Sequence, residues 1–159
     1  MPGKAQAELK QTRPFESAAV EAYVNILRTA DALSRGIEQV LKPAGLSGPQ
    51  YNVLRILRGA GADGLPCREI GERMITRDPD ITRLLDRLEK RGLIRRARDR
   101  QDRRVVTTRI VKEGLRILKE LDRPLLAAHH RQLRHLPQRR LAELIRLLEE
   151  ARAGADNTD

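Results

Sequence analysis

The fold follows from residues 65–109, LPCREIGERMITRDPDITRLLDRLEKRGLIRRARDRQDRRVVTTR, in which two helical patterns come before two strand patterns. A short helix is predicted at Arg68–Ile75. A second helix is predicted to start at Asp78–Pro79, where an acceptor side chain precedes a proline, and to stop at Gly92. Its apolar residues recur on one helical face: Ile81, Leu84, Leu85 and Leu88. Two short helices around a tight turn predict a helix-turn-helix.

The residues after Gly92 have the pattern of a β-hairpin. Strands are predicted at Leu93–Ala97 and Arg104–Arg109, the second of them rich in β-branched residues. The polar segment 98–103 between them carries three arginines and two aspartates. A basic hairpin directly behind a helix-turn-helix predicts a wing. The expected fold class is therefore mainly α with a small antiparallel β wing, a winged helix-turn-helix.

Long amphipathic helices are predicted on both sides of this stretch. Apolar residues recur every three or four positions from Phe15 to Leu41, and Pro43 and Gly45 end that pattern. Ser47 with Gln50 forms a capping-box pattern that begins a helix over Tyr51–Leu57. A further long helix is predicted from Lys112 to about Leu136 and a last one from Pro137 to about Arg152.

These elements divide the chain into expected regions. The regions are an N-terminal dimerisation helix at 15–42, the winged helix-turn-helix at 47–110, C-terminal dimerisation helices at 111–153, and flexible tails at 1–14 and 154–159.

The charge of the chain favours a polyanionic partner. The 159 residues have a formal net charge of +10, and only 2% are aromatic, which leaves little to stack on the bases of single strands. Residues 65–109 hold 14 Lys and Arg against 8 Asp and Glu, whereas the rest of the chain holds 18 against 14. The positive charge is concentrated on the predicted helix-turn-helix and wing, so duplex DNA is the expected partner.

Other classes of protein are disfavoured. No apolar run approaches the length of a membrane span, and the N-terminal sequence lacks the apolar core of a signal peptide, so we expect a cytoplasmic protein. We expect no cofactor and no enzymatic activity, because no phosphate-binding loop or catalytic set of residues stands out. His129, His130 and His135 do not have the spacing of metal ligands, and no metal site is expected. Cys67 is interpreted as an inert small residue rather than an oxidant sensor.

Three segments resemble the MarR family of bacterial transcription regulators: ITRLLDRLEKRGLIRR (81–96), DRQDRR (99–104) and Gly114 after the second strand. The resemblance covers nearly the whole chain. It implies a homodimer held by the N- and C-terminal helices, a recognition helix in the major groove and a wing arginine in the minor groove. It also implies release of DNA by a small molecule or a redox signal.

Two positions depart from the family pattern. Val111 stands where the family usually has threonine, which removes a side-chain cap from the helix after the wing. Asp80 stands where the family often has threonine or serine, which leaves the base preference open.

The exposed face of the predicted recognition helix supplies the candidate DNA contacts. Arg83, in the N-terminal turns, is expected to contact a base, with the O6 and N7 atoms of guanine as its natural partners. Thr82 is expected to touch a thymine methyl group or a phosphate. Arg77 and Arg87 are expected to meet phosphates. The alternative for Arg87 is a structural role, in which it lies one helical turn from Arg83 or Arg91 and Asp86 and Glu89 balance the charge. Asp80 has two interpretations, a favourable charge at the helix N-terminus or a contact to cytosine.

The wing supplies a second set of contacts. Arg100, Arg103 and Arg104 compete for the minor groove, and Arg103 is the choice that the resemblance favours. Asp99 and Asp102 are expected to brace the neighbouring arginines.

The resemblance also places an effector pocket near the junction of the long helices and the winged module. Its expected lining residues are Tyr23, Ile26, Tyr51, Leu54 and Leu118, with an ordinary hydrophobic core as the alternative. The expected effector is a small aromatic or amphipathic molecule. The predicted function is therefore a dimeric repressor that binds a near-palindromic double-stranded operator, with a protein-interaction scaffold that reads no bases as the alternative.

Overall fold

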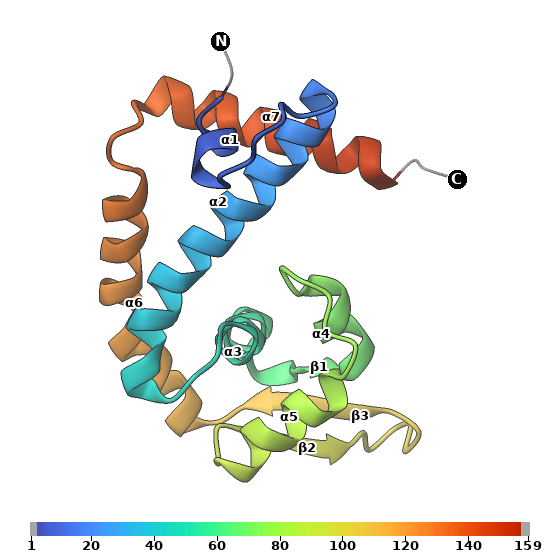
Figure 1. Ribbon diagram of the computed structural model, residues 1–159. Helices are drawn as coiled ribbons and strands as arrows, with labels where there is room; N and C mark the ends of the chain where they lie inside the picture. The colour runs from blue at the N-terminus through green and yellow to red at the C-terminus, as the bar shows by residue number, and fades with distance from the viewer. Residues whose placement is uncertain (1–2, 157–159) are drawn as a thin grey trace.

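The computed structural model describes residues 3–156, which form a mainly helical protein with one small sheet (Figure 1). The helices are α1 (Lys4–Glu8), α2 (Ala18–Leu41), α3 (Gly48–Ala60), α4 (Cys67–Arg73), α5 (Ile81–Lys90), α6 (Lys112–Leu133) and α7 (Gln138–Asp156), with 3-10 turns η1 (Lys42–Ala44) and η2 (Gly61–Asp63). The strands are β1 (Leu65–Pro66), β2 (Ile94–Arg98) and β3 (Val106–Ile110). The predicted fold class is confirmed.

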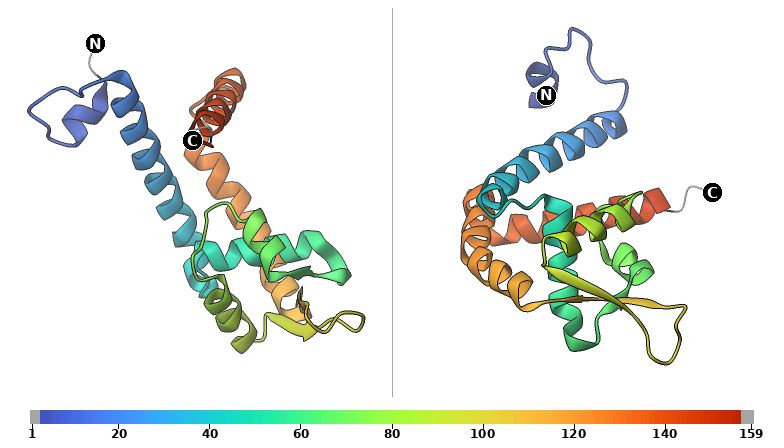
Figure 2. Two further views of the ribbon diagram at one scale, coloured as in Figure 1. Left: turned by 90° about the vertical axis from the view of Figure 1, so that its right-hand side faces the viewer. Right: turned by 90° about the horizontal axis from the view of Figure 1, so that it is seen from below.

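The three long helices α2, α6 and α7, here called the helical arms, extend from one side of the molecule (Figures 1 and 2). Helix α2 packs along α6. The Gln132 side chain lies against Gly36, where a Cβ would be 2.2 Å from the Gln132 Nε2 atom. That nitrogen instead donates a hydrogen bond to the Leu33 carbonyl at 2.9 Å.

The elements within residues 47–110 form the winged module. Its sheet has the strand order β1-β3-β2 and is antiparallel throughout. The hairpin register pairs Ile94 with Ile110 and Arg98 with Val106. Strand β1 was not predicted, because it is two residues long, contains Pro66 and is defined only by its pairing with β3.

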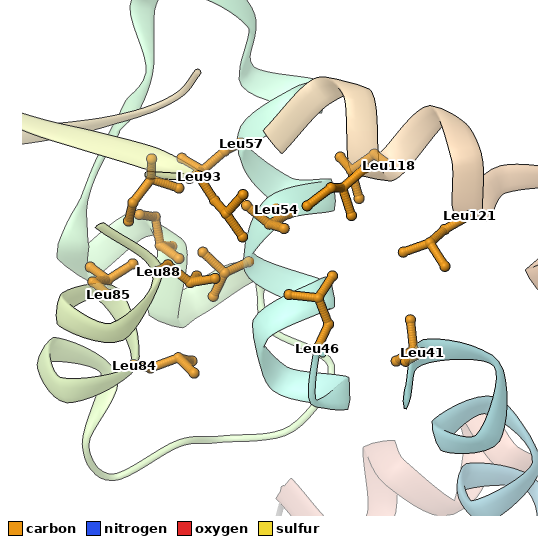
Figure 3. Packing of buried hydrophobic residues seen from close by; sticks show 14 of the residues in the cluster. Leu41, Leu46, Leu54, Leu57, Leu84, Leu85, Leu88, Leu93, Leu118 and Leu121 are labelled. Atoms are coloured by element: carbon orange, nitrogen blue, oxygen red, sulfur yellow. The ribbon is translucent and has the colours of Figure 1, made fainter. Parts of the chain in front are cut away.

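The hydrophobic core lies where α3, α5, α6 and the sheet meet (Figure 3). Leu54 and Leu57 of α3 point towards Leu88 of α5 and towards Leu93, and each of these side chains is at most 2% exposed. Leu118 of α6 is fully buried beside them. Leu54 and Leu118, which were predicted to line an effector pocket, are therefore part of this core.

The start of α5 differs from the prediction by two residues. The helix begins at Ile81, and its N-cap is Asp80, whose carboxylate accepts a hydrogen bond from the Arg83 N–H at 3.2 Å. The Asp78 carboxylate instead accepts from the Asp80 N–H at 2.9 Å and closes a turn over Pro79. The sequence Asp-Pro-Asp offers two acceptors, and the second one caps the helix.

Both ends of the chain contain more helix than predicted. Residues 1–14 were expected to be a flexible tail, but they include α1, whose Ala5 is buried and whose Glu8 forms an ion pair with Arg28 of α2 at 3.3 Å. Helix α7 continues to Asp156, into the expected tail at 154–159, of which 157–159 lie outside the described residues. Helix α6 begins after Val111 with no side-chain cap, as expected for that residue.

Candidate nucleic-acid interface

Helix α5 is sharply two-sided. Leu84, Leu85 and Leu88 are buried against the core, while Thr82, Arg83 and Arg87 are exposed on the other side. Within residues 3–156 no side chain or carbonyl pairs with the guanidinium of Arg83 or Arg87. The helix therefore presents uncompensated positive charge to solvent, with Arg83 in its first turn and Arg87 in its last.

The carboxylates on α5 are occupied by an arginine of strand β2. The Arg96 guanidinium donates to Asp86 and to Glu89, at 3.0 Å for the Glu89 Oε1 atom, and the Arg96 N–H donates to Glu89 Oε2 at 2.7 Å. The side-chain hydrogen bond from Arg96 holds the pKa of Glu89 below its ordinary value. Asp86 and Glu89 are thus held by Arg96, and the alternative in which they balance Arg87 is not what the structure contains.

The tip of the wing is held together by its two aspartates. The Asp99 carboxylate accepts from the backbone N–H groups of Gln101 and Asp102 at 2.7 and 3.2 Å, and Asp102 accepts from the Arg104 N–H at 3.0 Å. The two backbone hydrogen bonds lower the pKa of Asp99. We expected these aspartates to brace the neighbouring arginines. Asp102 contacts Arg104, but through its backbone N–H, because an aspartate in a tight turn reaches the N–H groups of its own turn first.

This arrangement leaves the arginine side chains of the wing free. Arg100, Arg103 and Arg104 are exposed, and none of their guanidinium groups is paired with a residue that the structure describes. Arg98 behaves differently, because its Nη1 atom donates to the Arg103 carbonyl at 3.0 Å and supports the turn. The three predicted wing candidates therefore point into solvent from a fixed backbone.

The turn between α4 and α5 adds two exposed side chains. Arg77 is exposed, as predicted, and has no partner among residues 3–156. Ile75 is 80% exposed, and its N–H donates to the Asn52 Oδ1 atom at 2.8 Å. The exposure of Ile75 was not predicted, because the sequence pattern places this residue in the preceding helix. The last inward-facing residue of that pattern is Met74, so the pattern could have indicated that Ile75 lies outside the helix.

The predicted contact arginines that have no partner among residues 3–156 form one named set, the free arginines: Arg77, Arg83, Arg87, Arg100, Arg103 and Arg104. Arg95 of β2 is also exposed and unpaired among these residues, but it was not a predicted contact. Several other arginines of the module are bound locally, as in the ion pairs of Arg68 with Glu72 and of Arg73 with Glu69. Helix α5 and the β2–β3 turn both lie at the end of the molecule farthest from α7 (Figures 1 and 2). The free arginines therefore concentrate positive charge on that end.

Comparison with known proteins identifies the relatives of this fold. The family model described as MarR family matches residues 46–106, which is almost the whole winged module. A crystal structure of a MarR transcription factor from Planctomyces limnophilus is 43% identical in sequence, with a TM-score of 0.66, and the match covers 85% of this chain and 98% of that one. The chain belongs to the MarR family.

Two further relatives have informative names. The HTH-type transcriptional regulator TtmR of Methylorubrum extorquens is 36% identical over 97 residues, and the match covers 61% of this chain and 49% of TtmR. This chain thus spans about half the length of that relative. CouR from Rhodococcus jostii, solved with p-coumaroyl-CoA bound, is 26% identical, with a TM-score of 0.71 and coverage of 86% and 95%.

Of the residues predicted to line an effector pocket, Tyr51, Leu54 and Leu118 share the hydrophobic core of this MarR-family chain, whereas Tyr23 and Ile26 do not belong to it. Tyr23 and Ile26 of α2 are 63% and 41% exposed, whereas Leu54 and Leu118 are buried in the core. Tyr51 is half-buried, and burial raises the pKa of its hydroxyl. An open hollow of about 720 Å³ lies elsewhere, between α2, α3 and α5, and is lined by Arg35, Glu38, Gln39, Lys42, Gly45, Leu46, Ser47, Gln50, Leu84 and Arg87.

The helical arms leave apolar side chains uncovered. No residue of α7 is buried, although Ile145 and Leu147 are large apolar residues that are 56% and 48% exposed. On α2, Tyr23 and Leu27 are 63% and 52% exposed one helical turn apart. Helices α2 and α7 thus present apolar surface that the chain itself does not cover.

None of the helices in residues 3–156 is both long and apolar enough to traverse a lipid bilayer. Over the same residues, no three His, Cys, Asp or Glu side chains are grouped so that they could hold a metal ion.

Proposed function

We propose that this MarR-family protein is a homodimeric regulator that binds double-stranded DNA at a near-palindromic operator. The observation that carries the proposal is the set of free arginines on α5, the preceding turn and the wing. Burying cationic side chains against phosphates releases counterions from DNA, which provides most of the affinity. Arginines held by internal ion pairs would not contribute in this way.

Each candidate has a role in the proposed complex. The N-terminal turns of α5 enter the major groove, where Arg83 contacts a guanine and Thr82 a thymine methyl group or a phosphate. Arg77 and Arg87 meet phosphates on either side and orient the helix. Asp80 is engaged as the N-cap of α5, so its main role is to fix the direction of that helix, and a contact to cytosine is secondary.

The wing reaches the minor groove in this arrangement. Arg103 is the first choice for insertion, with Arg100 and Arg104 beside it, because a narrow minor groove attracts guanidinium groups. The hydrogen bonds of Asp99 and Asp102 keep the turn fixed, so less conformational entropy is lost when the arginines bind. Arginine side chains on a preformed loop suit this contact well.

The second copy of the chain is proposed to cover the apolar surface of the helical arms. Large apolar patches on a soluble protein mark interaction sites, and α7 leaves most of its apolar residues uncovered. A two-fold dimer through α2 and α7 would place the two α5 helices about 34 Å apart, one turn of DNA. Each subunit then contacts one half-site.

Regulation is proposed to be repression relieved by a small molecule. A dimer bound across two half-sites excludes other proteins from that DNA. An aromatic or amphipathic effector in the open hollow would contact Arg87, which also belongs to the free arginines, so its binding would compete with DNA. The CouR structure with p-coumaroyl-CoA supports an effector of this class. The proposal includes no catalytic step, and it places the protein in the cytoplasm.

The test is a pair of arginine variants that differ only in whether the arginine is already paired. Arg83→Ala should lower affinity for the operator about tenfold or more, while affinity for unrelated duplex falls much less. Arg68→Ala, which removes an arginine paired with Glu72, should change neither affinity measurably. Fluorescence anisotropy with both duplexes at two salt concentrations measures this. An equal fall in both affinities for Arg83→Ala would show that Arg83 contacts the phosphate backbone of DNA and not a base.

The alternative of a protein-interaction scaffold makes a different prediction. A scaffold that reads no bases would bind duplex DNA without preferring any sequence. A single preferred palindrome, together with a steep salt dependence, distinguishes the regulator from the scaffold.

A further inference from the structure

Arg91 stands at the C-terminal end of α5 on a fixed backbone. It is the C-cap residue, and its N–H donates to the Arg87 carbonyl at 3.2 Å. The next residue, Gly92, has a φ of +72°, which favours glycine, and its N–H donates to the Glu89 carbonyl at 2.8 Å. The base of the Arg91 side chain therefore moves only with α5 itself.

The Arg91 guanidinium connects this helix to the end of α2. Its Nη1 atom donates to the Gly45 carbonyl at 2.7 Å, and its Nη2 atom donates to the Ala44 carbonyl at 3.0 Å. These two carbonyls lie at the C-terminal end of α2 and η1, where carbonyls lack partners within the helix and the helix dipole is negative. A cationic fork with two donors matches that site well.

This fork is the polar tie between α5 and the end of α2. Among the residues that the structure describes, no other hydrogen bond or ion pair joins α5 to the segment 18–45. Otherwise α2 and α5 are connected through the hydrophobic core, because both helices pack against α3, and Leu46 lies between Leu41 of α2 and Leu84 of α5 (Figure 3). Apolar packing is non-directional, so it holds the two helices together without fixing their angle as a pair of hydrogen bonds does.

The angle matters because α2 is a long lever. Its 24 residues span about 36 Å at a rise of 1.5 Å per residue. A rotation of about 5° at the joint would therefore displace one end against the other by about 3 Å, close to the rise of one base pair. Small changes at the joint thus correspond to changes of half-site register.

We propose that Arg91 is a positioning residue that sets the spacing of the two half-sites. It acts through the fork to Ala44 and Gly45, which fixes the recognition helix relative to the arm that carries the dimer. The inference rests on the proposed function, because it requires a dimer that contacts two half-sites. Arg91 itself contacts no DNA in this account.

The experiment measures preference for half-site spacing. Its probes are the palindrome selected by the wild-type protein, the same duplex with one base pair inserted or deleted at the centre, and a duplex with a single half-site. The wild type should bind the altered duplexes about tenfold more weakly than the palindrome. Arg91→Ala and Arg91→Lys should reduce that discrimination to about threefold or less, with half-site affinity unchanged. Lysine keeps the charge but lacks the rigid two-donor fork.

Arg58→Ala is the matched control. Arg58 also forms a two-donor fork, to Asp122 of α6 with both distances at 3.0 Å, but it lies outside the joint between α2 and α5. It should lower the melting temperature and leave the spacing preference at the wild-type value. Full wild-type discrimination in both Arg91 variants would overturn the inference. A wild-type protein without any spacing preference would overturn the proposed dimeric function, and the inference with it.

Discussion

The winged module and the helical arms differ in how completely the chain covers its own apolar residues. In the module, Leu54, Leu57 and Leu88 are fully buried, and the residues left exposed are mostly charged. In the arms, α7 has no buried residue and Ile145 is 56% exposed. Apart from Ile75, Val105 and Val106, the module therefore covers its own large apolar residues, whereas the arms present surface that a second copy of the chain would cover.

The same comparison separates two uses of arginine. Arg91 and Arg96 are bound by carbonyls and carboxylates, and they hold α5 against α2 and against β2. The free arginines have no such partner among residues 3–156. One set of arginines thus orients the recognition helix, and the other set remains available for phosphates and bases.

The largest effect is expected from a cavity in the module. Leu54→Ala removes a fully buried side chain and should lower the free energy of unfolding by about 2–5 kcal/mol. Urea unfolding followed by circular dichroism measures this. If the loss were below about 1 kcal/mol, the core would not be as tightly packed as described here.

The next effect tests the arms. The double variant Leu144→Asp, Ile145→Asp places charges on the exposed apolar side of α7 and should give a monomer by analytical ultracentrifugation. Operator affinity should then fall about 100-fold or more, because two linked half-site contacts become separate binding events. Glu149→Ala, an exposed change on the same helix, is the control and should remain dimeric. A double variant that stays dimeric would show that α7 is not part of the interface.

A smaller effect is expected from single arginines of the wing. Arg103→Ala should weaken operator binding about tenfold, and loss of a phosphate contact should lower the slope of log affinity against log salt by about one. Arg100→Ala and Arg104→Ala, measured in parallel by gel shift, rank the three residues. If none of these variants lost affinity, the wing would have no place in the complex.

The smallest effect concerns pH. The carboxylate of Glu89 binds Arg96, so its pKa in the folded protein lies below the ordinary value of 4.5. The stability from this contact is present above 4.5 and is lost as pH falls through the lowered pKa. Glu89→Gln should therefore show a shallower loss of stability at acid pH than the wild type. The measurement is the urea midpoint at several pH values, with Glu149→Gln as control; equal slopes for Glu89→Gln and wild type would contradict the contact.

The sequence predicted the elements that depend on local signals. The capping box of Ser47 and Gln50 is present, with hydrogen bonds of 3.0 and 3.2 Å. Gly92 ends α5 in a left-handed conformation, and the apolar face of that helix is buried as its spacing indicated. These features were accessible because each depends on residues within a few positions of one another.

The features that the sequence did not predict join distant residues. Strand β1 exists only by pairing with β3, and the Arg91 fork reaches a carbonyl 46 positions away. Arg96 binds two carboxylates of α5 across the turn at Gly92, although nearer arginines were available to them. Two of the residues predicted for the effector pocket, Leu54 and Leu118, lie in the core for a related reason. Helical spacing identifies the inner face of a helix, but not whether that face meets a core or a cavity.

The central claim is that the free arginines of two winged modules bind one DNA duplex together. The most direct test is selection of bound sequences from random duplexes with the purified full-length protein. The account predicts enrichment of a single inverted repeat whose half-site centres lie about 10 base pairs apart. Recovery of unrelated sequences without a common motif, or of a single half-site, would contradict it.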